Sequence, residues 1–289
     1  MYHIIKEIEG AAMGKFDGVL IVSDYDGTWY SGSTYPQNNA EAVKYFISEG
    51  GRFCISSGRC KTHLKWVLEG VPYNAPCTLC NGAHIFDYDE DRTYYESFLP
   101  ASCKHAIQSA VNKFDDVWFE VIAQGGELIY TPKNLQGEPQ SGASERRFFD
   151  SFAEVPEGWQ KILFSGENAK LKEIEAYLEG IINDEVYLIF TSPNLLEVCA
   201  AGVDKGSGLL RLEKLLGTEH KNVYAVGDFY NDIEMIGAAG VGCAVGGCIG
   251  ELIDAADIVL CHPREGAIAD LISRLDALPD ARERNLLGK

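Results

Sequence analysis

The run Gly18-Val19-Leu20-Ile21-Val22-Ser23-Asp24-Tyr25-Asp26-Gly27 places four aliphatic residues directly before two acids that are separated by one residue. A short apolar run bounded by glycine is typical of a strand that is covered on both faces of a sheet. Residues two apart in a strand point to the same side, so Asp24 and Asp26 are expected together at the carboxyl edge of that sheet. Like charges held so close repel each other, which favours a bound metal or proton.

The same four-residue pattern, Asp-x-Asp-Gly, also occurs in calcium-binding loops and as an ordinary turn after a strand. A calcium loop needs further ligands at alternating positions and a closing Glu. Thr28, Trp29 and Tyr30 follow here instead, which excludes a calcium loop. This stretch alone does not distinguish a metal site from a solvated turn. The distinction depends on the residues at the other strand ends.

Size and composition are those of an ordinary globular protein. The chain has 289 residues, 46% of them hydrophobic and 24% charged, and could form one large domain or two smaller ones. No stretch approaches the roughly 18 apolar residues of a membrane span. The start, residues 1–7, lacks the basic head and apolar middle of a signal peptide. We therefore expect a cytoplasmic protein with no membrane partner, as a monomer or a homodimer.

The formal net charge is −18, which argues against a nucleic-acid partner because such binding needs a basic stripe. It also means that a small anionic substrate would need a local cation to overcome the field of the protein. The nine cysteines lie mostly in apolar runs, which favours reduced, buried thiols. Cys77 and Cys80 have the spacing of a metal or redox pair, but no second pair or His cluster completes a zinc site.

The two outer thirds of the chain alternate strand-like and helix-like segments, which is typical of βαβ crossovers and a parallel sheet. We expect both thirds to contribute to one Rossmann-like sheet of an α/β core. The expected strands are residues 19–23, 52–56, 77–80, 222–226, 242–245 and 258–261. The expected helices are residues 38–48, 61–68, 205–216, 232–239, 249–255 and 266–275.

The middle third has a different pattern of expected elements, because strand-like runs follow one another there without intervening helices. These runs are residues 84–88, 93–98, 118–122 and 128–131, and they predict an antiparallel sheet. Helices are expected over Ser144–Ala153 and Asn168–Gly180, and an exposed loop over Pro132–Gly142. This segment is therefore expected to be an inserted α/β domain.

Ligands of open parallel sheets bind beyond the carboxyl ends of the strands, and polar residues gather at these ends. The second strand runs into Ser57-Gly58-Arg59, whose hydroxyl and backbone N–H groups could hold an anion or simply cap a helix. Lys205 enters a helix, and Gly227-Asp228 with Asn231-Asp232 follow a later strand. Two acids and an amide at one turn make a site for a hard cation plausible.

Taken in order, these segments resemble the haloacid dehalogenase superfamily. The match consists of Asp24-Tyr25-Asp26-Gly27-Thr28, Ser57-Gly58-Arg59, Lys205-Gly206, and Gly227-Asp228 with Asn231-Asp232. Asn81-Gly82-Ala83, Glu197-Val198 ahead of Gly202–Gly206, and Glu265-Gly266 are similar to the Cof-type sugar-phosphatase group. The resemblance implies a catalytic core of residues 1–83 and 198–289, and an inserted α/β cap of residues 84–197 that selects the leaving group.

The resemblance also implies a role for each motif residue. Asp24 would attack phosphorus to form an aspartyl phosphate, and Asp26 would protonate the leaving oxygen and then activate water. Mg²⁺ would be bound by Asp24, the Asp26 backbone carbonyl and Asp228, with Asp232 or Asn231 in support. Lys205 would neutralise charge at the nucleophile. The implied phosphate-binding residues are Ser57, Gly58, Lys205 and Asn231.

The expected activity is thus the magnesium-dependent hydrolysis of small phosphorylated metabolites, most plausibly sugar phosphates. Two alternatives are a phosphomutase of the phosphomannomutase type and a non-catalytic binding module with the same fold. The chain departs from the usual pattern at Tyr25, where Leu is usual, at Ser57, where Thr is commoner, and at Gly247-Cys248, where Asn-Ala is frequent. The first two departures leave the required oxygen atoms in place, whereas the third weakens any inference about the substrate.

Overall fold

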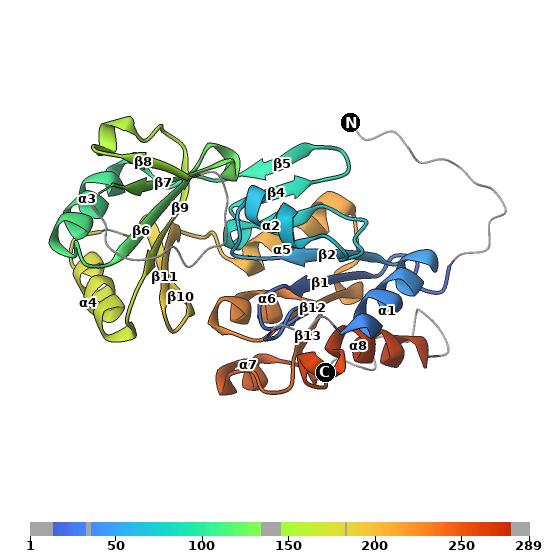
Figure 1. The fold of residues 1–289 in the computed structure, drawn as a ribbon. Coiled ribbons are helices and arrows are strands. Elements are labelled where there is room, and N and C mark those ends of the chain that lie inside the picture. Colours follow the sequence, from blue (N-terminus) through green and yellow to red (C-terminus); the bar gives the residue numbers. More distant parts are fainter. Residues whose placement is uncertain (1–13, 33–35, 134–145, 183, 279–289) are drawn as a thin grey trace.

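The computed structural model describes residues 14–32, 36–133, 146–182 and 184–278 (Figure 1). These residues form two sheets, and the chain passes from the first sheet to the second and back again. Residues 1–7 and most of the expected loop Pro132–Gly142 lie outside the described residues. The expected α/β fold, with a parallel-sheet core and a second, mainly antiparallel sheet, is confirmed.

The first sheet has eight strands in the order β14-β13-β12-β1-β2-β3-β4-β5. Neighbours pair in parallel from β14 to β3 and antiparallel from β3 to β5. The strands are β1 Leu20–Asp24, β2 Arg52–Ser56, β3 Cys77–Leu79, β4 His84–Asp87, β5 Arg92–Glu96, β12 Val223–Gly227, β13 Val241–Ala244 and β14 Ile258–Val259. Strand β1 lies between β2 and β12, so its end is enclosed on both sides.

Helices cover both faces of this sheet, because right-handed crossovers that run in opposite directions from the centre of a sheet lie on opposite faces. One crossover joins β1 to β2 and another joins β12 to β13. Helix α1 packs against α8, and α5 packs against α6. The helices are α1 Gln37–Ser48, α2 Lys61–Val67, α5 Lys205–Leu216, α6 Ile233–Ala238, α7 Gly250–Ala255 and α8 Ala267–Asp276.

The apolar run that opened the sequence is the buried centre of the molecule. Leu20, Ile21 and Val22 are fully buried in the core of the first sheet. Each such side chain contributes about 1.5–3 kcal/mol of hydrophobic stabilisation relative to exposure. Burial on both faces explains why the run lacks the polar alternation of a strand with one solvated face.

The second sheet has six strands in the order β10-β11-β9-β6-β7-β8, with helices α3 and α4 packed together. All neighbours pair antiparallel except β7 and β8, which are parallel. The strands are β6 Trp118–Ala123, β7 Leu128–Pro132, β8 Arg146–Phe149, β9 Trp159–Ser165, β10 Val186–Ser192 and β11 Leu195–Ala200, and the helices are α3 Lys104–Lys113 and α4 Asn168–Glu179. Short 3₁₀ turns occur at η1 Cys80–Gly82, η2 Ala101–Cys103, η3 Gln124–Gly126, η4 Phe152–Glu154, η5 His220–Asn222, η6 Tyr230–Asp232 and η7 Pro263–Glu265.

The strands of the second sheet alternate between two environments. One set of residues packs in the core that the sheet shares with α3 and α4, namely Phe119, Val121, Ile162, Phe164, Leu196 and Val198. The residues between them line a cavity, namely Glu120, Ile122, Lys161, Leu163, Leu195 and Glu197. Successive side chains of a strand point to opposite faces. One face of this sheet therefore packs in the core with α3 and α4, and the other face forms one wall of the cavity.

The helix expected over Ser144–Ala153 is wrong for the described part of that range. Residues 146–149 form β8, which pairs with β7, and η4 follows with Ser151 and Glu154 in a reciprocal capping box. The middle third also contains α3, β9, β10 and β11, which were not expected. Strands β4 and β5, which we expected in the insertion, are hydrogen-bonded to the first sheet. We therefore propose that the cap begins after Glu96, rather than at residue 84, and includes all of β11.

Gly206 brings α5 close to α6, which places the neighbouring Lys205 at the sheet edge. A Cβ atom at position 206 would lie 2.4 Å from the backbone carbonyl oxygen of Glu234. We expect Gly206→Ala to lower the free energy of unfolding by about 1–3 kcal/mol through overpacking, measured by denaturant unfolding. Gly237→Ala in α6 is the matched control, because a Cβ atom at position 237 would have no neighbour within 4 Å. That control should be neutral or slightly stabilising, and equal losses in both variants would contradict the close-approach argument.

Candidate active site

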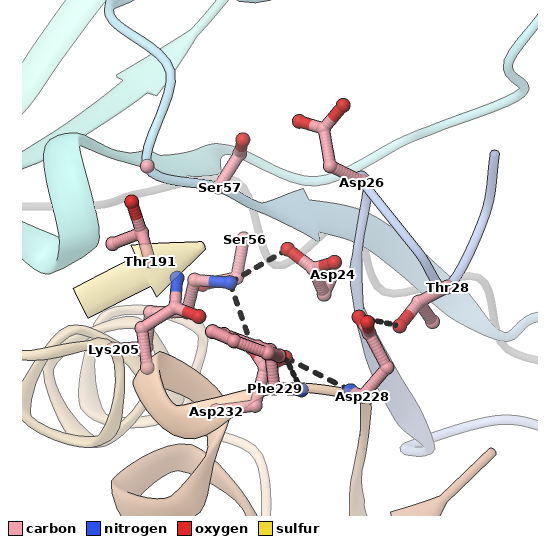
Figure 2. Close-up of polar contacts among 12 residues, drawn as sticks. Asp24, Asp26, Thr28, Ser56, Ser57, Thr191, Lys205, Asp228, Phe229 and Asp232 are labelled. Carbon is pink, nitrogen blue, oxygen red and sulfur yellow. Dashed lines mark hydrogen bonds and ion pairs between the residues drawn. The ribbon is translucent and has the colours of Figure 1, made fainter. Parts of the chain in front are cut away.

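The carboxyl ends of three adjacent parallel strands bring the sequence motifs together (Figure 2). Asp24 is the last residue of β1, Ser57 follows β2, and Asp228 follows β12. The register aligns Asp24 with Ser56 on one side, and Ser23 with Val226 on the other. Side chains separated by up to about 200 residues in sequence therefore meet at one edge of the sheet.

Lys205 joins two acids at the base of the site. Its Nζ atom lies 2.6 Å from Asp24 Oδ1 and 2.7 Å from Asp232 Oδ1. The ammonium group is buried, with the side chain 1% exposed. Burial by itself would lower the pKa of Lys205, but the charges of Asp232 and Asp24 and their hydrogen bonds raise it above its usual value. Lys205 is thus held as a permanent cation beside Asp24.

The first turn of α5 supports this placement. Asp204 caps the helix, since its Oδ1 accepts a hydrogen bond of 2.6 Å from the backbone N–H of Ser207. Ser207 Oγ in turn accepts from the backbone N–H of Asp204 at 3.1 Å. Such reciprocal capping satisfies N–H groups that a helix otherwise leaves without partners. The helix start that carries Lys205 is therefore well defined.

Asp232 is occupied on both carboxylate oxygens. Oδ1 pairs with Lys205, and Oδ2 accepts the backbone N–H groups of Asp228 at 2.9 Å and Phe229 at 3.2 Å. Asp232 therefore closes the turn after β12 and holds Lys205 in place. This geometry favours the supporting role for Asp232 over direct coordination of a metal.

Asp24, Asp228 and Asp232 each place a carboxylate oxygen within 4.8 Å of the others. Burial raises the pKa of Asp24 well above its usual range, Lys205 lowers it in part, and the charges of Asp232, Asp228 and Asp26 raise it further. Burial and the charge of Asp232 also raise the pKa of Asp228 to about 7, against a hydrogen bond of 2.9 Å from Thr28 Oγ1. Negative charge is thus in excess here, and a divalent cation with oxygen ligands fits such a site.

The glycine of the first motif makes room for this cluster. Gly27 has a φ of +95°, and a Cβ atom there would lie 2.1 Å from Asp228 Oδ2. Any other residue would be strained by its backbone conformation and would displace the Asp228 carboxylate. Gly27 is therefore required for the two strand ends to approach each other.

Asp26 lies apart from the buried acids and pairs with Arg59. Arg59 Nε and Nη2 each donate to one oxygen of the Asp26 carboxylate at 2.8 Å, and the Arg59 guanidinium lies 5.5 Å from the centre of the Tyr25 ring. The Asp26 side chain is 50% exposed, and Figure 2 shows it pointing away from Lys205. The sequence left open whether Arg59 reaches an anion or the surface, and in this structure its partner is Asp26.

The remaining predicted residues surround an open cavity. Ser57 Oγ accepts the backbone N–H of Arg59 at 3.1 Å, which leaves the hydroxyl proton able to donate elsewhere. Asn231 Nδ2 donates to Asn81 Oδ1 at 3.3 Å. Ser57, Gly58 and Asn231 all line a cavity of about 470 Å³ together with Asp24, Asp26 and Asp228. Lys205 and Asp232 lie beneath it.

The second sheet supplies the opposite wall of this cavity, and of its residues the sequence had singled out only Glu197. The polar ones are Glu120, Lys161, Thr191, Ser192 and Glu197, and the apolar ones include Ile122, Ile129, Leu163 and Leu195. His63 from α2 also lines it, and burial lowers the pKa of His63 to about 4. The other residues, such as Lys161 and Thr191, carried no sequence signal for a site, because only the folded register shows which face of the sheet they occupy.

All nine cysteines are free, and seven of them are buried. Burial raises the pKa of Cys77 to about 12, so its thiol is unreactive at neutral pH. Within the described ranges, the acids at Asp24, Asp228 and Asp232 are the group suited to hold a metal, and neither Cys77 nor Cys80 belongs to it. No helix among the described residues is long and apolar enough to cross a membrane.

A parallel-sheet core whose strand-end acids face a second domain across a cavity defines a capped α/β protein. Residues 21–272 match the haloacid dehalogenase-like hydrolase family. The chain belongs to that family, and the expected relation to its Cof-type phosphatases is confirmed.

Individual relatives cover most of the chain. The HMP-PP phosphatase of Klebsiella pneumoniae is 24% identical over 243 residues, which span 82% of this chain and 84% of the relative. Phosphatase YwpJ of Bacillus subtilis is 25% identical and spans 89% of this chain and 99% of its own length. The solved structure of a haloacid dehalogenase-like hydrolase from B. subtilis superposes with a TM-score of 0.77 at 24% identity, covering 89% of this chain and 99% of that one.

The raised pKa of Asp228, about 7, predicts a specific pH dependence of stability in metal-free protein. A carboxyl whose pKa is raised by folding binds its proton more tightly in the folded state, so its contribution is present at low pH and is lost as the pH rises toward 7. We expect Asp228→Asn to gain stability relative to the wild type between pH 5 and 7, approaching about 1 kcal/mol per pH unit.

Denaturant unfolding of both proteins in chelator measures this difference at each pH. The subtraction removes the opposite contribution of His63 and His84, whose pKa values are lowered to about 4 and which therefore favour folding as the pH rises through their unfolded range. A difference that does not change with pH would show that Asp228 is not protonated in the folded protein.

Proposed function

We propose that this protein is a magnesium-dependent phosphatase of small phosphorylated metabolites, with sugar phosphates as its most plausible substrates. The observation that carries the proposal is the contact of 2.6 Å between Lys205 Nζ and Asp24 Oδ1 at the base of a cavity. It joins a buried carboxylate, able to act as a nucleophile, with a fixed cation able to neutralise a phosphoryl group. The relatives from K. pneumoniae and B. subtilis are both named as phosphatases.

In the proposed first step, an Asp24 oxygen attacks phosphorus while the bond from phosphorus to the leaving oxygen breaks. Lys205 holds Oδ1 of Asp24 and so fixes the rotation of the carboxylate. Asp26 donates its proton to the leaving oxygen, which departs as an alcohol. Asp26 lines the same cavity and its side chain is 50% exposed, and it would act as the acid once its ion pair with Arg59 opens.

In the second step, water attacks the phosphorus of the aspartyl phosphate, and the bond from Asp24 to phosphorus breaks. Asp26 accepts the proton of the attacking water, which restores both acids and releases inorganic phosphate. We assign Ser57 Oγ, the Gly58 backbone N–H and Asn231 to the phosphoryl oxygens. The hydroxyl of Ser57 can donate because it already accepts the N–H of Arg59.

Residues that would hold Mg²⁺ are the carboxylates of Asp24 and Asp228 and the backbone carbonyl of Asp26. When bound, the ion would screen the phosphoryl charge from the carboxylates and orient the phosphoryl group. Two unit charges about 4 Å apart interact by roughly 4 kcal/mol at an effective dielectric of about 20. A phosphate dianion facing Asp24 alone would therefore be repelled by about twice that amount, which Lys205 and a divalent cation together would reverse.

The cavity favours a small, polar leaving group. Its volume of about 470 Å³ is in the range of small-molecule sites. Charged and hydroxyl side chains from the second sheet alternate with aliphatic ones on its wall, so a leaving group with hydroxyls could form hydrogen bonds there. One relative is named for HMP-PP, and a small phosphorylated compound of that general size suits this cavity as well.

The free cysteines are consistent with a reducing compartment, and we propose the cytoplasm.

Activity toward a set of sugar phosphates and other small phosphate monoesters tests metal and substrate together. We expect phosphate release with Mg²⁺, loss of it with EDTA, and recovery when Mg²⁺ is returned in excess. Released phosphate should equal the substrate consumed. An isomerised hexose phosphate without free phosphate would instead indicate the phosphomutase, and metal-independent hydrolysis would contradict the assigned magnesium site.

Asp24→Asn tests the nucleophile. Hydrolysis of p-nitrophenyl phosphate should fall by about 10³-fold or more, because an amide oxygen cannot replace the attacking carboxylate. The fold should persist, since the substitution keeps the side-chain volume and relieves repulsion with Asp228. Circular dichroism and thermal unfolding check this. Asp254→Asn in α7, at an exposed position, is the control and should retain wild-type activity. Full activity in Asp24→Asn would refute the assignment, and an inactive wild type would favour a binding module.

A further inference from the structure

Lys161 is a buried lysine of β9 that none of the proposed steps uses. Its side chain is 6% exposed and points into the cavity, on the face opposite to the core of the second sheet. Its Nζ atom lies 2.7 Å from Glu197 Oε2 and 2.5 Å from the backbone carbonyl oxygen of Gly58. A buried ammonium is costly unless its partners are well placed. One of its two partners here belongs to the other domain.

Glu197, the partner of Lys161 in the neighbouring strand β11, also reaches the first domain. Its Oε2 accepts a hydrogen bond of 2.7 Å from Asn81 Nδ2, and its Oε1 accepts one of 3.2 Å from Thr191 Oγ1. Asn81 belongs to the turn after β3, and its Oδ1 accepts from Asn231. The pair of Lys161 and Glu197 is therefore bonded to two loops at the edge of the first sheet.

The bond to Gly58 acts on the peptide group between Gly58 and Arg59. Lys161 holds the carbonyl oxygen of this peptide, and Ser57 Oγ accepts its N–H at 3.1 Å. A peptide group is planar, so holding both ends fixes its orientation. The hydrogen bond from the Arg59 N–H occupies one lone pair of Ser57 Oγ, so the hydroxyl proton of Ser57 points elsewhere. The turn that we assign to the phosphoryl group is thus oriented by a residue of the second domain.

We propose that Lys161 is a positioning residue through which the second domain orients the phosphate-binding turn of residues 57–59. This role rests on the proposed function and extends it, because the cap then contributes to binding of the phosphoryl group as well as to selection of the leaving group. Lys161 contacts the Gly58 carbonyl, whereas the phosphoryl group would contact Ser57 and the Gly58 N–H. Its effect should therefore be the same for every leaving group.

Inorganic phosphate is the probe that separates this role from reading of the leaving group, because it has none. In Lys161→Met, we expect the inhibition constant of inorganic phosphate to rise about tenfold, with Mg²⁺ present. The kcat/KM values for p-nitrophenyl phosphate and for the best sugar phosphate should fall about ten- to hundredfold, by similar factors, because small misplacements of binding groups have effects of this size. Lys170→Met is the matched control, since Lys170 lies in α4 and pairs with Asp116 at 3.5 Å, outside the cavity.

A second variant guards against misfolding, because Lys161→Met leaves the Glu197 carboxylate buried without its cation. In Lys161→Met/Glu197→Gln, the new amide can accept from Asn81 and donate to Thr191, while the bond to Gly58 stays absent. This variant should fold with a near-normal melting temperature and show the same weakened inhibition by phosphate. Unchanged phosphate inhibition in the folded double variant would overturn the proposal, and a loss confined to large leaving groups would assign Lys161 to the leaving group instead.

Calorimetric titration of phosphate keeps this test independent of the proposed reaction. If the wild type hydrolyses no phosphate ester, the proposed function fails, but weaker phosphate binding by the double variant would still support the positioning role. If the wild type is an active phosphatase and the double variant binds phosphate equally well, only the role of Lys161 is refuted.

Discussion

Excess negative charge at the end of β1 is the constraint on which the rest of the structure depends. Three carboxylates, two of them buried, approach within 4.8 Å of one another, and one ammonium group, that of Lys205, lies between two of them. Placing that ammonium requires a capped start of α5 and a close approach of α5 to α6 at Gly206. It also requires Asp232, whose carboxylate bonds Lys205 with one oxygen and the turn after β12 with the other. The remaining excess, at Asp24 and Asp228, is what makes a divalent cation fit.

The second sheet, which faces this charged edge, buries its charged side chains as ion pairs. Its alternate residues form an ordinary apolar core with α3 and α4, and the residues between them carry buried ion pairs into the cavity. Both Lys161 with Glu197 and Arg146 with Glu120 join opposite charges there, at 2.7 and 3.0 Å. A buried pair adds little net stability compared with apolar packing. We therefore attribute the pair of Lys161 and Glu197 to the two loops that it contacts, at Gly58 and at Asn81, rather than to the free energy of folding.

The sequence predicted the parallel strands of the first sheet well because most of them are local apolar runs that end in a turn, whereas β4 and β5 were expected in the insertion. The strand Arg52–Ser56 and the helix Lys205–Leu216 have the predicted bounds, and the family follows from residues at those strand ends. The second sheet was harder, because some of its pairings, such as β6 with β9, join strands that are far apart in the sequence. Residues 146–149, expected in a helix, become a strand by pairing with β7. Lys161 and Glu197 become neighbours only through the pairing of β9 with β11, which no local pattern specifies.

A chain with a net charge of −18 needs local compensation of that charge to bind the phosphorylated substrate that we propose. Long-range repulsion between exposed charges is screened within about 10 Å at moderate salt, whereas charges at the base of a cavity are screened much less. In the proposed mechanism, Lys205 below the cavity and the backbone N–H of Gly58 therefore matter more than the many exposed acids. The position of that turn depends on both domains, since β2 delivers it and Lys161 holds its carbonyl group. In the proposed function, binding of the phosphoryl group thus depends on both domains, and not on the core alone.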